Sequence, residues 1–179
     1  MSIPNLLSIF RILLLPVFVL VFIFAAPEYH YWLAVILVVS GLSDILDGLI
    51  ARKFNQVTQL GKFLDPLADK LTVATVLACL VFLYPQVIFV LVVYVLKELL
   101  MGGGFLLLSK RKIALESSKW FGKMATVVTY IVMFLLIIIP NISDTWMVVL
   151  NTLVVAVTVF AFVMYAVEFL KICRKQEKQ

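Results

Sequence analysis

Apolar runs dominate the pattern along this chain. Six stretches each hold about 20 mostly apolar residues, the length at which an α-helix crosses the hydrocarbon core of a bilayer. They cover roughly residues 6–26, 30–51, 61–83, 86–108, 120–139 and 145–170. Short breaks with helix-ending residues separate them. The pattern predicts an all-α integral membrane protein whose residues 1–179 form one domain of six transmembrane helices.

Basic residues occur in alternate breaks. The second and fourth breaks and the C-terminal tail contain them, whereas the first, third and fifth breaks have no Lys or Arg. The positive-inside rule then places both termini in the cytoplasm and predicts a multi-pass protein of the cytoplasmic membrane. The net charge of +5 therefore describes one membrane face, which attracts anionic lipid head groups and phosphorylated substrates. It does not indicate nucleic-acid binding.

Four aspartates interrupt the second and third apolar runs, in SDILDGLIARKFNQVTQLGKFLDPLADK. Asp44 and Asp47 share one face of the second predicted helix, and Asp65 and Asp69 share one face of the third. A short turn joins the two helices, so we expect them to be antiparallel neighbours that bring all four carboxylates together. Asp44 is about 12 Å along the helix axis from Arg52, which predicts a pocket sunk below the cytoplasmic surface and open to it.

Four carboxylates this close need compensation in a medium of low dielectric constant. Arg52 and Lys70 supply two positive charges, which is too few. Two divalent cations balance the four charges, and Mg²⁺ or Mn²⁺ suits oxygen ligands and substrate phosphates. The small residues Gly48, Ala51 and Gly61 lie on the same faces. They leave room for a ligand against the backbone, or they allow close helix packing.

The spacing Asp44-x2-Asp47-Gly48-x2-Ala51-Arg52-x8-Gly61-x3-Asp65-x3-Asp69 resembles the signature of the CDP-alcohol phosphotransferase family at every fixed position. The resemblance implies a six-helix catalytic domain that usually forms a homodimer. It also implies an enzyme that transfers a phosphatidyl-type group from a CDP-linked lipid to an alcohol and releases CMP.

The resemblance also implies roles for single residues. Asp44, Asp47 and Asp65 would bind a pair of Mg²⁺ or Mn²⁺ ions, with Asp69 completing the metal set and acting as general base. The CDP-lipid site would be formed by Asp44, Asp47, Gly48, Ala51, Arg52 and Gly61. The chemistry agrees, because two metal ions can clamp a diphosphate while a carboxylate takes the proton of the attacking hydroxyl.

The acceptor alcohol is open between two members of the family. IPNLLSIFRILLLPVF and LDPLADK are similar to members that make phosphatidylglycerophosphate from CDP-diacylglycerol and sn-glycerol 3-phosphate. Cardiolipin synthases, whose acceptor is the membrane lipid phosphatidylglycerol, share both stretches.

A phosphorylated acceptor needs cations, and Arg11, Lys97 and Lys123 are the candidates. Lys97 lies inside an apolar run, where it should face a polar cavity or pair with Glu98 or the acids. Lys123, in WFGKMAT, lacks the second lysine that the synthases usually carry, which counts against a phosphorylated acceptor.

Two other classes of function compete with the enzyme. Intramembrane carboxylates commonly mark ion pathways, so an ion or proton transporter is one alternative. All four aspartates are expected near one membrane face, however, and no comparable acid continues a route across. A purely structural membrane protein, in which the acids pair with Arg52, Lys70 and Lys97, is the other alternative.

Overall fold

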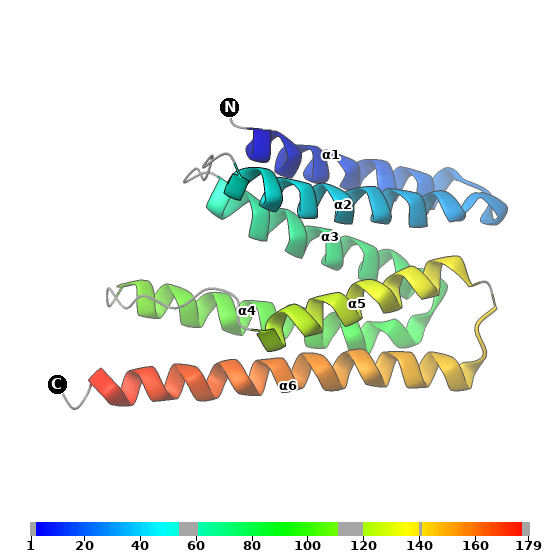
Figure 1. Cartoon of the computed structure of the whole chain (residues 1–179). Coiled ribbons are helices and arrows are strands. Elements are labelled where there is room, and N and C mark those ends of the chain that lie inside the picture. Colours follow the sequence, from blue (N-terminus) through cyan, green and yellow to red (C-terminus); the bar gives the residue numbers. More distant parts are fainter. Residues whose placement is uncertain (1–2, 54–60, 111–119, 140, 177–179) are drawn as a thin grey trace. The chain divides into compact units, whose positions relative to one another are not determined.

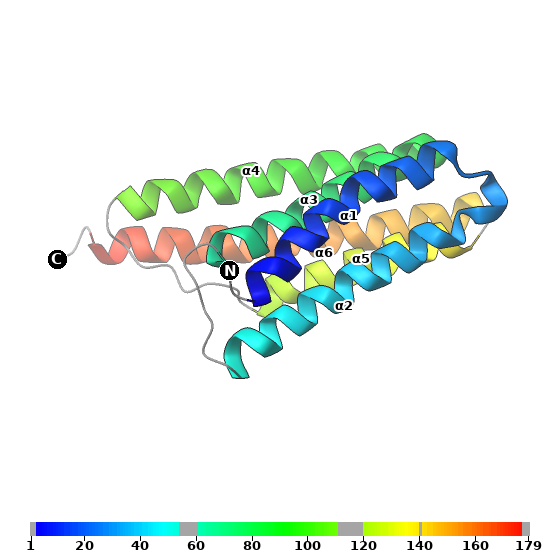
Figure 2. The ribbon, with the colours of Figure 1, turned by 90° about the horizontal axis from the view of Figure 1, so that it is seen from above.

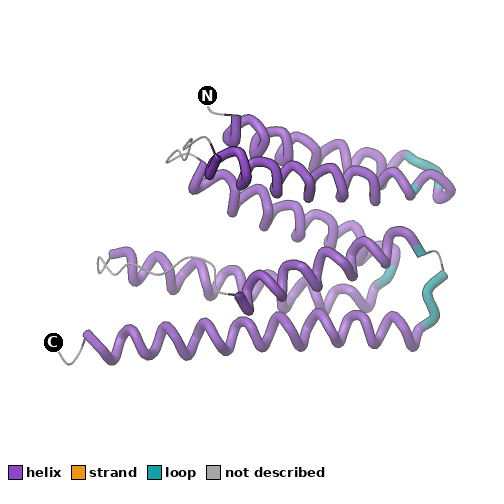
Figure 3. Tube along the Cα trace, viewed as in Figure 1, coloured by secondary structure: helices purple, strands orange, loops and turns teal. Residues whose placement is uncertain are grey.

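The computed structural model describes residues 3–53, 61–110, 120–139 and 141–176. In that part of the chain all regular structure is helical, with no strand (Figure 3). The helices are α1 (Ile3–Phe24), α2 (Tyr31–Lys53), α3 (Gly61–Leu83), α4 (Ile88–Lys110), α5 (Trp120–Ile138) and α6 (Asp144–Gln176), with short 3₁₀ helices at Pro27–Tyr29 and Pro85–Val87. All six α-helices are long and apolar enough to cross a membrane. The all-α, six-span prediction is confirmed.

The last helix is longer than its apolar run. α6 continues to Gln176, beyond the predicted end near residue 170. Lys171, Arg174, Lys175 and Gln176 are good helix formers, and cations near a helix C-terminus interact favourably with the helix dipole. Asn141, between α5 and α6, has a φ of 57°, a left-handed conformation that asparagine adopts more readily than most residues. Hydropathy alone therefore located the span and not the end of the helix.

The chain divides into two compact units, which are described separately. The first comprises Met1–Leu83 with Met133–Asn141, and the second comprises Tyr84–Val132 with Ile142–Gln179. In the first unit α1 packs against both α2 and α3 (Figures 1 and 2), whereas direct packing of α2 on α3 is sparse among the described residues. The sequence predicted that these two helices are antiparallel neighbours. The structure instead makes α1 the helix that connects them.

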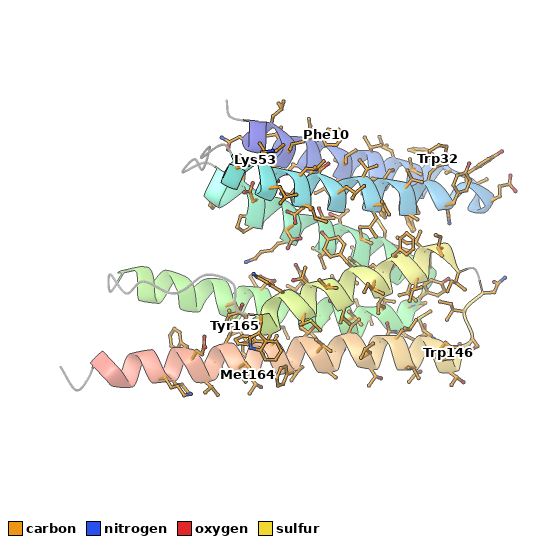
Figure 4. All side chains as sticks on the ribbon, in the orientation of Figure 1. Phe10, Trp32, Lys53, Trp146, Met164 and Tyr165 are labelled. Atoms are coloured by element: carbon orange, nitrogen blue, oxygen red, sulfur yellow. The ribbon has the colours of Figure 1, made fainter. Side chains whose placement is uncertain are left out.

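The core of the first unit is apolar and its outer surface is also apolar. Leu33 and Leu77 are buried, while Leu13 and Leu20 on α1 are more than half exposed. Exposed leucines are expected where a helix faces lipid acyl chains, because the acyl chains are as apolar as leucine and no hydrophobic effect drives these side chains into the core. Figure 4 labels Trp32 near the start of α2, where aromatic side chains commonly anchor a span at the membrane interface.

The second unit packs α4 against α6, and α5 against α6. Phe121 and Ala125 of α5 form a buried cluster with Ala161 of α6, and the Tyr165 ring packs edge-on against Phe121. Figure 4 labels Tyr165 in this region of α6. A Cβ added at Gly122 would lie 2.4 Å from the Tyr165 hydroxyl oxygen, so a larger residue there would force the tyrosine side chain to shift.

Candidate active site

The candidate site lies where three helix ends of the first unit meet. The starts of α1 and α3 and the end of α2 lie at one end of this unit, which Figure 4 marks with Lys53 (Figures 1 and 4). Asp44 and Asp47 are in the last turns of α2, and Asp65 and Asp69 are in the first turns of α3. Helix periodicity places each pair on one helical face, as the sequence predicted.

Arg11 of α1 bridges the two aspartates of α2. Its Nη1 donates to Asp44 Oδ1 at 2.5 Å and its Nη2 donates to Asp47 Oδ2 at 2.8 Å. The Arg11 side chain is 1% exposed, so the guanidinium is fully inside the unit. A planar guanidinium presents parallel N–H donors, and here two of its nitrogens each contact a different carboxylate. α1 therefore supplies a buried cation to the acidic pair.

Two more polar residues of α1 lie on the same face as Arg11. Ser8 is fully buried and its hydroxyl donates a hydrogen bond to Asp65 Oδ1, while Asn5 is 4% exposed. The spacing of three residues between Asn5, Ser8 and Arg11 keeps them on one side of the helix. We call these three residues the α1 polar stripe. Sequence reasoning did not include Asn5 and Ser8, although their spacing with Arg11 inside an apolar run was the signal.

The two aspartates of α2 differ sharply in environment. The Asp47 side chain is 4% exposed and the Asp44 side chain is 47% exposed. Asp47 also lies within electrostatic range of both Asp44 and Asp65, so negative charge is concentrated around it. Burial of an uncompensated charge costs several kcal/mol, and the Arg11 guanidinium offsets part of that cost for Asp47. Asp44 is the acid of the pair that is open to an incoming group.

The structure describes some of the remaining residues of the predicted CDP-lipid site. Gly48 is on α2 beside the acids, and a Cβ added there would meet nothing within 4 Å among the described residues. This open space supports room for a ligand over close helix packing at Gly48. Gly61 is buried at the start of α3, and Asp69 is partly buried two turns later. Ala51 and Arg52 belong to α2, and their side chains lie outside the described part.

The predicted acceptor residues fall in different units. Arg11 belongs to the first unit, where it contacts the acids. Lys97 and Lys123 belong to the second unit. Lys97 pairs with Glu98, with Nζ 2.5 Å from Oε1, and its Nζ lies 5.2 Å from the centre of the Tyr94 ring. Lys123 is exposed on α5. The sequence analysis gave an ion pair with Glu98 as one alternative for Lys97. The role of Arg11, Lys97 and Lys123 in acceptor binding stays a prediction.

The fold and the site define a multi-span helical membrane protein with ionisable residues inside its spans. Such residues are costly in a bilayer and mark functional sites. Comparison with known proteins identifies the family, because residues 1–168 match the CDP-alcohol phosphatidyltransferase family. The chain belongs to this family.

Curated relatives include CDP-diacylglycerol--glycerol-3-phosphate 3-phosphatidyltransferases from Escherichia coli strain K12, Shigella flexneri serotype 5b and Shigella boydii serotype 4. Each is 47% identical to this chain over 73 residues. The matched stretch covers 41% of this chain and 40% of the relative, so the chain aligns with about two fifths of the length of these relatives.

Members of this family use divalent metal ions, and the acidic residues fit such ions chemically. Carboxylate oxygens are the ligands that Mg²⁺ and Mn²⁺ prefer. The Arg11 guanidinium already lies between Asp44 and Asp47, so these carboxylates converge on one cation. Across the described ranges, no three acidic, His or Cys side chains are close enough to ligate one ion. The fit therefore rests on the Asp44–Asp47 pair, with Asp65 and Asp69 on α3.

Proposed function

We propose that this protein transfers a phosphatidyl group from CDP-diacylglycerol to sn-glycerol 3-phosphate, giving phosphatidylglycerophosphate and CMP. The observation that carries the proposal is the acidic pair of α2, which converges on a buried cation in a chain that matches the family over residues 1–168. The names of the relatives support the choice of donor and acceptor. The pair lies in the segment 43–70, where the sequence matches the family signature at every fixed position.

In the proposed reaction the acceptor hydroxyl attacks the phosphorus that carries the diacylglycerol. A new phosphorus–oxygen bond forms, the bond to the CMP oxygen breaks, and CMP leaves. Asp69 takes the proton of the attacking hydroxyl as general base. Two Mg²⁺ or Mn²⁺ ions held by Asp44, Asp47, Asp65 and Asp69 would supply charge neutralisation for the diphosphate when bound.

The chain's own residues bind and orient the donor. The open space beside Gly48 admits the nucleotide diphosphate against the backbone of α2. Ala51, Arg52 and Gly61 complete this wall in the proposal. The exposed side of Asp44 faces the entering group, while Asp47 is fixed by Arg11.

The placement in the membrane is also part of the proposal. The basic breaks and tail set both termini and the acidic end of the first unit on the cytoplasmic side of the cell membrane. The lipid donor then enters from the bilayer, while glycerol 3-phosphate and CMP exchange with the cytoplasm. Lys97 and Lys123 would bind the acceptor phosphate. We further propose a homodimer embedded in membrane lipids.

An acceptor screen tests the proposal. Purified protein in lipid nanodiscs receives CDP-diacylglycerol, Mn²⁺, and either glycerol 3-phosphate or phosphatidylglycerol, and CMP and the lipid product are measured. We expect CMP and phosphatidylglycerophosphate with glycerol 3-phosphate. If only the reaction with phosphatidylglycerol gives a product, and that product is cardiolipin, the acceptor is phosphatidylglycerol and not glycerol 3-phosphate. No CMP with either acceptor, together with ion flux in sealed vesicles, would favour a transporter.

A further inference from the structure

We infer that Arg11 is a built-in counter-ion of the Asp44–Asp47 pair that competes with divalent cations for the same two carboxylates. Arg11 therefore sets how tightly the protein binds its metal. This inference rests on the proposed metal site and adds to it a residue that opposes metal binding. It also differs from the role in acceptor binding that the sequence predicted for Arg11.

The first support is geometric. Arg11 uses one oxygen of each carboxylate, Oδ1 of Asp44 and Oδ2 of Asp47. A cation held at both side chains by charge-assisted hydrogen bonds occupies the region between them. A divalent ion that bridges Asp44 and Asp47 must either displace the guanidinium from that region or share the oxygens with it. Both require the Arg11 contacts to weaken.

The second support is electrostatic. Arg11 is fully buried in a unit whose surface is largely apolar, so solvent does not screen its charge. A unit charge at 4 to 6 Å changes the affinity of a carboxylate for a proton by about tenfold or more, and a divalent ion carries twice that charge. Arg11 therefore lowers metal affinity even where it is not fully displaced.

The third support is an unused donor. The Arg11 Nε is buried and has no hydrogen-bond partner among the described residues. Buried polar atoms normally have partners, so the present position does not satisfy the whole guanidinium. Arg11 can gain an acceptor by moving, for example a phosphate oxygen of a bound diphosphate. That acceptor would offset the loss of the Arg11 hydrogen bonds to Asp44 and Asp47 when a metal ion binds these carboxylates.

A purely structural role for Arg11 makes a different prediction. If Arg11 only holds α1 against α2, its removal loosens the acidic pair and metal binding becomes weaker or stays the same. If Arg11 binds the acceptor phosphate, its removal raises the KM for glycerol 3-phosphate and leaves metal affinity unchanged. Only a competing counter-ion predicts tighter metal binding after the arginine is removed.

Direct titration with Mn²⁺, followed by the electron paramagnetic resonance signal of the free ion, tests the inference without substrates or turnover. The full chain is used in nanodiscs, with Arg11→Met, Arg11→Lys and Asp47→Asn. Lys171→Met is the matched control, because it removes an exposed positive charge far along the chain on α6. We expect Arg11→Met to bind Mn²⁺ about tenfold tighter or more. Arg11→Lys keeps the charge but loses the fork, and should bind a few-fold tighter.

The outcomes separate this inference from the proposed metal site. If Asp47→Asn binds Mn²⁺ as the parent does, the metal site itself is wrong. If Asp47→Asn loses Mn²⁺ but Arg11→Met binds it no tighter than the parent, the counter-ion role of Arg11 is wrong and the metal site stands. Should Arg11→Met not fold, Arg11→Lys decides, because equal or weaker Mn²⁺ binding by that variant also overturns the inference.

Discussion

Replacing Asp47 by asparagine should destabilise the protein far more than the same change at Asp44. Both carboxylates contact Arg11, but the Asp47 side chain is 4% exposed and that of Asp44 is 47% exposed. Removing one partner of a buried ion pair costs about 3–5 kcal/mol, because the other charge stays buried. Arg11 keeps Asp44 in this variant, and the repulsion of Asp47 by Asp44 and Asp65 disappears. We therefore expect a loss of about 2 kcal/mol for Asp47→Asn.

The corresponding loss at Asp44 should be small. A pair with a half-exposed partner is screened by solvent, and such pairs contribute about 0–1 kcal/mol. Arg11 also keeps its buried partner Asp47 in the Asp44→Asn variant. The difference between the two variants is therefore at least about 1 kcal/mol, or several-fold in the folded-to-unfolded ratio.

The assay is unfolding of the purified protein by SDS titration, followed by far-ultraviolet circular dichroism, with no divalent ion added. Asp144→Asn is the matched control, because Asp144 is an exposed aspartate in the first turn of α6. Equal losses at Asp44 and Asp47, or a gain in stability for Asp47→Asn, would refute the reasoning from burial.

Four further predictions concern other features. Gly122→Ala should lower the free energy of unfolding by about 1–3 kcal/mol, because the added Cβ would overlap the Tyr165 hydroxyl. Gly102→Ala, whose Cβ would meet nothing within 4 Å among the described residues, should be neutral or slightly stabilising in the same unfolding assay. Lys97→Met should raise the KM for glycerol 3-phosphate by about tenfold, measured as CMP release, and an unchanged KM would remove Lys97 from the acceptor site. Chelation by EDTA should abolish CMP release, and excess Mn²⁺ or Mg²⁺ should restore it; activity that survives exhaustive chelation would contradict the metal site.

Much of the fold followed from the sequence because a bilayer restricts the choice of structure. Runs of about 20 apolar residues can only cross as helices, so the six spans were predictable. The faces of Asp44 and Asp47 on α2, and of Asp65 and Asp69 on α3, followed from helix periodicity. Packing partners did not follow. The short connection between α2 and α3 makes them neighbours, but it does not determine that α1 packs against both.

That missing choice explains what sequence reasoning did not find at the site. Arg11 was assigned to the acceptor because it is a cation, and nothing in its own helix indicated which acids it meets. Ser8 and Asn5 were not selected at all. Their spacing with Arg11 marks a polar face, but a polar face on α1 has a meaning only once α1 is known to pack against both acidic helices. Three-dimensional packing supplied the partner that charge and spacing left open.

The most direct test of the central claim is CMP release from CDP-diacylglycerol in the presence of Mn²⁺ and glycerol 3-phosphate, compared between the parent protein and Asp69→Asn. The account predicts metal-dependent CMP formation by the parent. It predicts that the rate of CMP release falls by at least about a hundredfold in Asp69→Asn, because a general base contributes about 10²–10⁴ in rate. The helix content of the variant, and its stability measured without Mn²⁺, should be retained. Near-normal CMP release by Asp69→Asn, or no metal-dependent CMP release by the parent, would contradict it.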